Sequence, residues 1–176
     1  HSTLVIEDTN STRIRPDGTL GAGVDEVSLA LRSAGGGQLL DASHDGYARR
    51  YGLLVRRRLL LTSDGTELAG EDVIEAAPAR LLRRQRERSF DLRFHLGPGV
   101  SATPTADGMG ALLKTPAGRI WAFKARRDDG TAQLSIEASI WVDSAGTLHR
   151  TQQLIVSGST EKLAADLHWS LKRAGK

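Results

Sequence analysis

One short segment, Ser43-His44-Asp45-Gly46-Tyr47, gathers an imidazole, a carboxylate and a phenol around a glycine. Such groups could serve as a base, an orienting acid and a second proton donor. The segment also has a structural interpretation, in which Asp45-Gly46 forms a turn, His44 caps a backbone group and the Tyr47 hydroxyl bonds to a carbonyl. Because adjacent residues of an extended chain point to opposite sides, the three groups reach one substrate atom only through a sharp bend.

A complete catalytic centre is not visible in the rest of the sequence. The chain lacks the HExxH pattern, the Gly-x-Ser-x-Gly elbow and a phosphate loop. Its other histidines, His1, His95, His149 and His168, form no recognisable pair. With no cysteine, only His, Asp and Glu remain as protein ligands for a metal. We therefore expect no catalytic residue in this chain.

Arginine dominates the charge of the protein, which is +3 overall. The triplet Arg56-Arg57-Arg58 and a second run within residues 80–88 make anionic partners plausible, either nucleic acid or an acidic polysaccharide. Alternation places Arg56 and Arg58 on one face of a strand over residues 52–62, and Arg57 on the other face among leucines. Two interpretations stay open: the arginines pair with carboxylates of a neighbouring strand, or one of them faces an acidic ligand.

The elements that would position these groups are strands. Period-two alternation is clear in residues 90–96, 134–142, 148–156 and 165–171 and in Val27/Leu29/Leu31. Turn signals that contain glycine separate the runs, for example Ser63-Asp64-Gly65 and Ser144-Ala145-Gly146. The pattern predicts an all-β fold, an antiparallel β-sandwich of stacked sheets with glycine-rich hairpin turns. At most one short helix is expected, over residues 79–88.

The 176 residues suffice for one domain with a core, and we draw a single domain over residues 1–176. No apolar run approaches the roughly 18 residues that a membrane span requires. The chain begins with His1 directly before the apolar run Leu4-Val5-Ile6. We therefore expect the sequence to be a fragment of a larger chain.

Five segments carry a resemblance when they are taken in order. They are residues 1–8 (His-Ser-Thr-Leu-Val-Ile-Glu-Asp), 44–47 (His-Asp-Gly-Tyr), 52–59 (Gly-Leu-Leu-Val-Arg-Arg-Arg-Leu), 70–72 (Gly-Glu-Asp) and 93–96 (Arg-Phe-His-Leu). Together they resemble the C-terminal β domain of the heparinase II/III-like polysaccharide lyases, over nearly the whole chain. Two positions depart from the family pattern: Val55 and Gly97 stand where relatives often carry histidine.

The resemblance implies an N-terminal α/α toroid, absent here, with a substrate cleft between toroid and β domain. It implies cleavage of a uronate-containing polysaccharide by β-elimination, in which a Tyr or His removes the C5 proton. Most of that catalytic set belongs to the toroid, so this domain alone is expected to be inactive. The resemblance also makes His1 one of three ligands of a divalent metal, usually zinc. Since the other ligands come from earlier strands, we expect no metal in this chain alone.

We therefore predict a non-catalytic domain that forms one wall of the cleft, with His44, Tyr47, Arg56 and Arg58 contacting an acidic polysaccharide. Relatives often act in the periplasm, so the resemblance implies a periplasmic or secreted protein, and no membrane contact is expected. The alternative is a stand-alone binding or scaffold module for an anionic polymer, either carbohydrate or nucleic acid. Only three Trp and two Tyr are available as stacking platforms, which makes nucleic acid the less favoured ligand.

Overall fold

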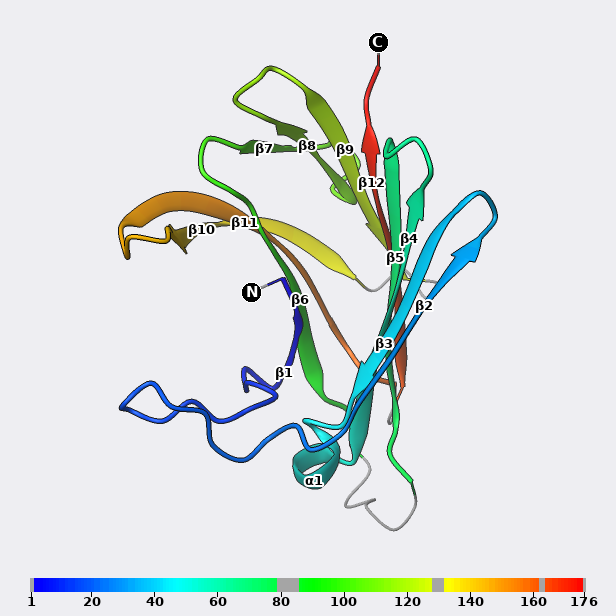
Figure 1. The fold of residues 1–176 in the computed structure, drawn as a ribbon, viewed down its shortest axis with the longest axis vertical. Helices are drawn as coiled ribbons and strands as arrows, with labels where there is room; N and C mark the ends of the chain where they lie inside the picture. The colour runs from blue at the N-terminus through cyan, green and yellow to red at the C-terminus, as the bar shows by residue number, and fades with distance from the viewer. Residues whose placement is uncertain (1, 79–85, 128–131, 162–163, 176) are drawn as a thin grey trace.

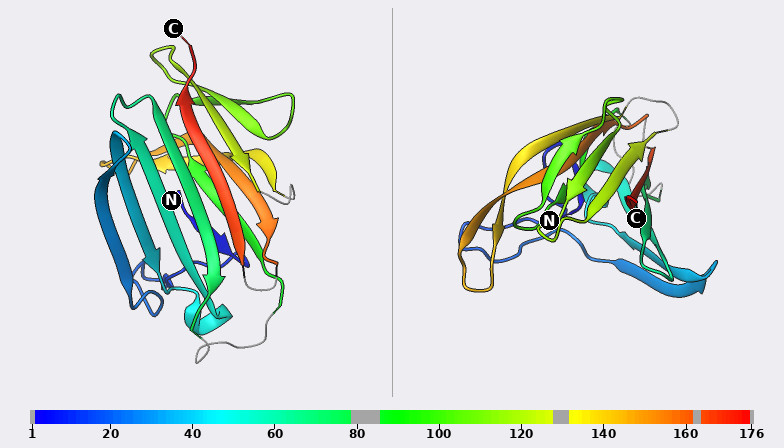
Figure 2. Two further views of the ribbon diagram at one scale, coloured as in Figure 1. Left: turned by 90° about the vertical axis from the view of Figure 1, so that its right-hand side faces the viewer. Right: turned by 90° about the horizontal axis from the view of Figure 1, so that it is seen from above.

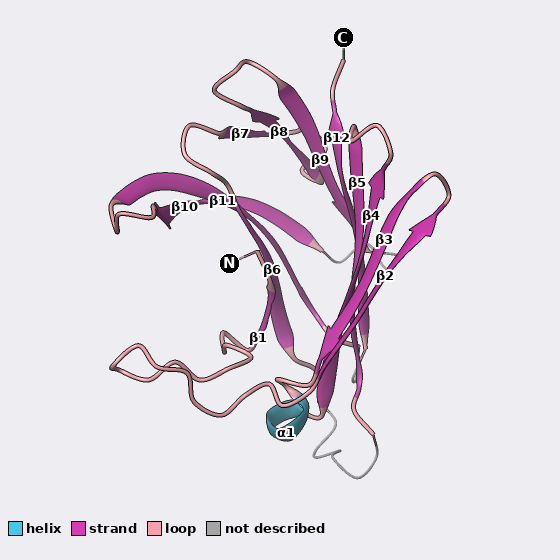
Figure 3. Cartoon of the chain, in the orientation of Figure 1, coloured by secondary structure: helices cyan, strands magenta, loops and turns pink. Residues whose placement is uncertain are grey.

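Two antiparallel sheets face each other in the computed structural model, which describes residues 2–78, 86–127, 132–161 and 164–175 (Figure 1). Loops and hairpin turns join nearly all the strands, and the described part of the chain contains one four-residue helix (Figure 3). The predicted all-β sandwich is therefore confirmed.

The smaller sheet has four strands in the order β1-β6-β11-β10. Their bounds are β1 Leu4–Ile6, β6 Ser89–His95, β10 Gln133–Val142 and β11 Leu148–Ser159. β6, β10 and β11 are strands that alternation predicts, because each places one apolar row toward the partner sheet.

The larger sheet has eight strands in the order β2-β3-β4-β5-β12-β9-β8-β7. Their bounds are β2 Val27–Ala34, β3 Gly37–His44, β4 Leu53–Thr62, β5 Glu67–Ala76, β7 Ser101–Pro104, β8 Gly110–Lys114, β9 Ile120–Arg126 and β12 Ala165–Arg173. The C-terminal strand β12 is inserted between β5 and β9, so it joins the two halves of this sheet (Figure 2).

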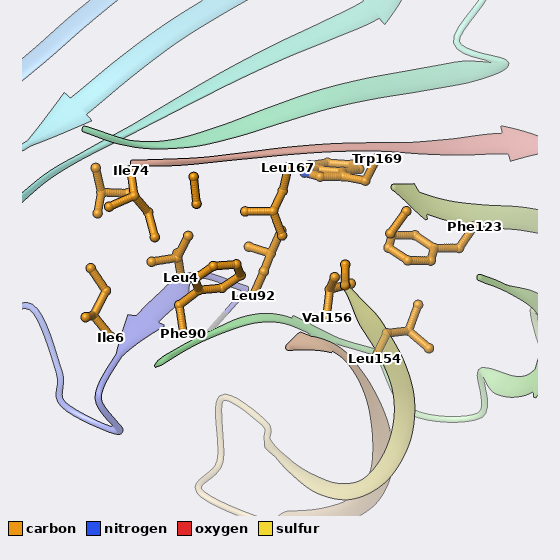
Figure 4. Packing of buried hydrophobic residues seen from close by; sticks show 14 of the residues in the cluster. Leu4, Ile6, Ile74, Phe90, Leu92, Phe123, Leu154, Val156, Leu167 and Trp169 are labelled. Atoms are coloured by element: carbon orange, nitrogen blue, oxygen red, sulfur yellow. The ribbon is translucent and has the colours of Figure 1, made fainter. Parts of the chain in front are cut away.

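The hydrophobic core lies between the two sheets (Figure 4). Leu92, Leu154 and Val156 of the smaller sheet face Leu167 and Trp169 of the larger one, and all are at most 8% exposed. Burying a side chain of this size stabilises the fold by about 1.5–3 kcal/mol. This core fixes which face of each strand points inward.

Gly70 shows how closely the core is packed. A Cβ atom at this position would lie 2.1 Å from Cε2 of Trp169, which is paired with Gly70 across β5 and β12. Only glycine leaves room for the indole here. The Trp169 ring in turn contacts Phe94 edge to face, with 4.8 Å between ring centroids.

The helix is α1, Ala48–Tyr51, a single turn that ends at Gly52 in the left-handed conformation. The sequence did not predict it, because one turn bounded by tertiary contacts leaves no helical period to detect. The predicted helical segment over residues 79–88 lies mostly outside the described residues, and residues 86–88 are not helical. No helix in the described part of the chain has the length and apolar character that a bilayer crossing requires.

The larger sheet is wider than its partner, so part of its inner face is uncovered. β2 and β10 stand on opposite arms of a V (Figures 1 and 2). The inner-face residues Val27, Leu29 and Leu31 of β2 are 65–70% exposed. Alternation predicts these residues to be half-buried, whereas the four-stranded sheet ends before it reaches them. We call Val27, Leu29 and Leu31 the β2 apolar row.

Candidate functional site

Arg56 and Arg58 lie together on the outer face of the larger sheet. Arg56 donates to both carboxylate oxygens of Asp41 on β3, through Nε at 2.7 Å and Nη2 at 2.5 Å. Arg58 donates from Nη1 to Glu71 Oε2 on β5 at 2.7 Å. The hydrogen bond from Arg56 holds the pKa of Asp41 below its usual value. These two arginines are therefore paired with carboxylates of neighbouring strands.

Arg57 points to the opposite, inner face and is the member of the triplet that is tied into the core. Its Nε donates to Asp72 Oδ1 at 2.8 Å, and Trp169 Nε1 donates to Asp72 Oδ2 at 2.8 Å. Asp72 is 1% exposed. Arg57 also donates from Nη1 to the backbone carbonyl of Ser2 at 2.8 Å, while its buried Nη2 meets no acceptor within the described residues.

His44 lies on the inner face beside Arg57, at the end of β3. It borders a hollow of about 250 Å³. The lining comprises Thr3, Leu4, Val24, Val27, Ala42, Ser43, His44, Val55, Arg57 and Asp72. Burial lowers the pKa of His44, and the nearby Arg57 charge acts in the same direction. The imidazole is therefore neutral near pH 7.

The backbone of Gly46 fixes how the His44 ring can act. The Gly46 N–H donates to His44 Nδ1 at 3.2 Å, so Nδ1 is the acceptor and Nε2 carries the proton of the neutral ring. The proton on Nε2 is a hydrogen-bond donor for a ligand oxygen. A base catalyst would need the other tautomer, so in this geometry His44 is suited to binding.

Tyr47 is buried, with 1% of its surface exposed. Its hydroxyl donates to the carbonyl of Thr9 at 2.9 Å and lies 3.3 Å from the carbonyl of Leu4. Burial raises the pKa of Tyr47 to about 12. The alternative that the sequence offered, a packed ring whose hydroxyl finds a carbonyl, describes this environment.

Asp45, the carboxylate of the same segment, also bonds to backbone. Its Oδ1 accepts from the N–H groups of Asp25 at 2.8 Å and Glu26 at 3.0 Å. Burial alone would raise the pKa of Asp45, but these two donors, its own backbone N–H and the nearby His44 together lower the pKa below its usual value. Asp45 therefore anchors the start of β2, and its side chain is not available to orient His44.

The four predicted substrate contacts thus divide between three places. Arg56 and Arg58 lie on the outer face, His44 on the inner face and Tyr47 in the core. Sequence reasoning did not select Arg57 and Asp72 as site residues, although alternation placed Arg57 among leucines on the face opposite Arg56 and Arg58. A lone arginine on an apolar face, with one acidic residue on a neighbouring strand, was the available signal.

The proposed metal ligand His1 lies outside the described residues. Within the part of the chain that the structure describes, no three His, Cys, Asp or Glu residues are grouped so that they could hold a metal ion. The neighbouring residue Ser2 is held at both ends: its carbonyl by Arg57 and its Oγ by the N–H of His95 at 3.1 Å.

Comparison with known proteins gives one family match and several structural ones. A family model described as heparinase II/III-like, C-terminal, matches residues 1–170. A sequence comparison with curated proteins found no significant match. Among solved structures, the fold is similar to a heparan sulfate lyase from Pedobacter heparinus, with 9% identity and a TM-score of 0.76 over 100% of this chain and 24% of that one.

A structure of heparinase III is similar to the same extent, with 14% identity and a TM-score of 0.72 over 99% of this chain and 23% of that one. At these identities the likeness shows the fold alone. The chain spans about a quarter of the length of the solved proteins that it resembles.

Proposed function

The chain belongs to the heparinase II/III-like C-terminal family, and from this membership we propose that it is the β domain of a lyase that cleaves a uronate-containing polysaccharide by β-elimination. The solved structures with this fold carry the names heparinase III and heparan sulfate lyase. In such a protein the domain would form one wall of the substrate cleft, and a preceding region would supply the catalytic groups.

The inner-face hollow is the observation that carries this proposal. His44, which carries its ring proton on Nε2, and Arg57 both line this hollow, at the edge of a sheet face that nothing in the described structure covers. The β2 apolar row borders the same edge. Exposed apolar rows of this kind mark surfaces that another part of a protein covers. We infer that the preceding region packs here and closes the cleft over His44.

The chemistry of this wall follows from its charges. β-Elimination develops negative charge on the uronate carboxylate as the C5 proton leaves, so donors aimed at that group lower the barrier. His44 donates one hydrogen bond without carrying charge, and Arg57 adds a positive field that Asp72 partly balances. The domain would thus bind and orient the sugar, and proton removal would fall to residues outside it.

The test compares inner-face and outer-face variants in the full-length enzyme. His44→Ala is expected to raise KM or lower kcat about tenfold on a uronate polymer, since one well-placed donor contributes on the order of 1–2 kcal/mol. Arg56→Gln and Arg58→Gln on the outer face are the matched controls. Unchanged kinetics in all three variants would remove the cleft-wall role, and losses only in the arginine variants would move the cleft to the outer face.

We also propose that position 1 supplies one ligand of a divalent metal, zinc by the family resemblance. The tight hold on Ser2 supports this, because it fixes the backbone next to His1. The remaining ligands must come from the preceding region. Metal analysis of the full-length protein, with His1→Ala as the variant, should show about one metal per chain in the parent and loss in the variant. Equal metal content in both proteins would contradict the assignment.

A further inference from the structure

A second hollow, which the cleft wall does not use, lies between the loop after β1 and helix α1. Its volume is about 620 Å³, within the roughly 300–1,000 Å³ typical of small-molecule sites. It is lined by Asp8, Thr9, Asn10, Ser11, Arg13, Ile14, Ala22, Gly23, Gly46, Arg49 and Arg50, and it shares no residue with the hollow at His44. We call it the loop hollow.

Three arginines surround the loop hollow. Arg49 pairs with Asp25 at 2.8 Å on the surface. Arg50 lies over the Tyr51 ring, with its Cζ 5.4 Å from the ring centroid. Within the described residues neither Arg13 nor Arg50 has a carboxylate at ion-pair distance, so two guanidinium groups are free to bind an anion.

Asp8, the one carboxylate among the lining residues that the structure describes, stands on a strained turn. Glu7 and Asp8 have φ angles of 53° and 49°, in the left-handed region where glycine and asparagine are favoured. Contacts around the turn hold it: Tyr47 donates to the Thr9 carbonyl, and the Tyr51 hydroxyl lies 3.0 Å from Thr9 Oγ1. Strain that the surroundings enforce in this way points to a functional position.

Close backbone contacts fix the walls of the hollow. A Cβ atom on Gly46 would lie 2.8 Å from the Ser11 Cβ, and one on Gly23 would lie 2.3 Å from the Thr12 Cα. The loop also bonds to itself, since Arg13 exchanges backbone hydrogen bonds with Ala22 and Gly21. The hollow is therefore built before any ligand arrives, which lowers the entropic cost of binding.

We propose that the loop hollow binds one acidic sugar unit of a polysaccharide. Arg13 and Arg50 donate to its carboxylate or sulfate. Asp8 accepts hydrogen bonds from the neighbouring hydroxyls, and Asn10 accepts through its amide oxygen and donates through its amide nitrogen. Among the lining residues that the structure describes there is no aromatic ring for a nucleic-acid base to stack on, which favours a sugar over a nucleotide. The ligand class rests on the proposed function, whereas the site lies apart from the cleft wall.

The experiment measures binding by the 176-residue chain with isothermal calorimetry. The probes are a heparan sulfate hexasaccharide, an oligomannuronate hexamer that carries carboxylates without sulfate, and a thymidine hexanucleotide. Arg13→Gln and Arg50→Gln are each expected to weaken saccharide binding at least tenfold. Arg32→Gln, an exposed arginine on β2, is the matched control and should change binding less than twofold.

Folding of each variant is checked by its thermal transition, and Arg50→Lys, which keeps the charge, should retain part of the affinity. Binding of both saccharides assigns the carboxylate as the anchor, and binding of the sulfated one alone assigns the sulfate. An equal loss with Arg32→Gln, equal binding of the oligonucleotide, or no saccharide binding would overturn the proposal. Because the cleft wall is tested by turnover of the full-length enzyme, either idea can fail alone.

Discussion

The hydroxyl of Tyr47 donates to the backbone carbonyl of Thr9, 38 positions earlier in the chain, at 2.9 Å. This bond ties the segment before α1 to the strained turn after β1, and so joins the two walls of the loop hollow. Tyr47 therefore acts on the site through the backbone that it holds.

Tyr47→Phe should destabilise the protein by about 1–3 kcal/mol, because it removes the donor that the buried Leu4 carbonyl and the partly buried Thr9 carbonyl share. The ring still fills its space, so no cavity term is added. Urea unfolding measures the change. Tyr51→Phe, which removes a hydroxyl next to the Thr9 side chain, is the matched control and should cost less, because Thr9 Oγ1 still donates to the Glu7 carbonyl. An equal loss of unfolding free energy in both variants would contradict the conclusion that the Tyr47 hydroxyl stabilises the fold more than the Tyr51 hydroxyl does.

The raised pKa of Tyr47 predicts a specific loss of stability in alkali. Its pKa is about 12 in the folded protein, against an ordinary value of 10.0. A group whose pKa rises on folding contributes stability that is complete below the unfolded value and is lost as pH rises through the folded one. The free energy of unfolding should therefore fall by about 2–3 kcal/mol between pH 10 and 12. Tyr47→Phe should remove that part of the decline. If the parent and the variant lose stability identically between pH 10 and 12, Tyr47 is not the cause of the decline.

The buried Arg57–Asp72 pair should be far more costly to break than the outer pair Arg58–Glu71. Asp72→Leu leaves a cation without its partner and is expected to cost about 3–5 kcal/mol. Glu71→Gln acts on a partly exposed pair and should cost about 0–1 kcal/mol. Adding Arg57→Met to Asp72→Leu should restore part of the stability, since the uncompensated charge is gone while Trp169 Nε1 stays unpaired. Chemical denaturation of the three variants measures these differences, and a double variant no more stable than Asp72→Leu would refute the charge argument.

Gly70→Ala should destabilise the core by about 1–3 kcal/mol or more, because the new methyl group would meet the Trp169 ring at 2.1 Å. Near-ultraviolet circular dichroism and thermal unfolding would detect the displaced indole. Gly97→Ala is the control, since no atom lies within 4 Å of its would-be Cβ and its φ is not positive. A Gly70→Ala protein with the parent's melting temperature would show that the indole can move at little cost.

The strands that the sequence predicted are those whose alternation is strict. The alternation of Phe90, Leu92 and Phe94 predicted β6, and the same period of two predicted β10, β11 and β12. β5 was not predicted, because Gly70 and Asp72 occupy inward positions where alternation calls for apolar side chains. Both residues fit there because of partners on other strands, Trp169 for Gly70 and Arg57 for Asp72. A local pattern cannot contain a partner that lies about a hundred residues away.

The sequence predicted on which face of the sheet each arginine lies, but it could not predict how β3 is aligned with β4. Alternation placed Arg56 and Arg58 on one side and Arg57 on the other. Of the two open interpretations, the structure shows the pairing with carboxylates of neighbouring strands: Arg56 with Asp41, Arg57 with Asp72 and Arg58 with Glu71. His44 shares the inner face because β3 pairs with β4 in the register His44 to Val55, and that register depends on the turn of helix between them. Since a shift of one residue exchanges the faces, the sequence alone could not group His44 with Arg57.

The β2 apolar row gives a last prediction, on the larger protein. Leu29→Gln and Leu31→Gln should change the stability of the 176-residue chain by less than about 0.5 kcal/mol, because both side chains are about two-thirds exposed. In the full-length protein the same changes should cost about 1–2 kcal/mol each, since the preceding region would cover the row and its burial would be lost. Leu112→Gln on β8, 43% exposed on the outer face, is the control and should be mild in both proteins. Urea unfolding of the two lengths supplies the comparison, and equal effects at both lengths would show that this face stays open in the complete protein.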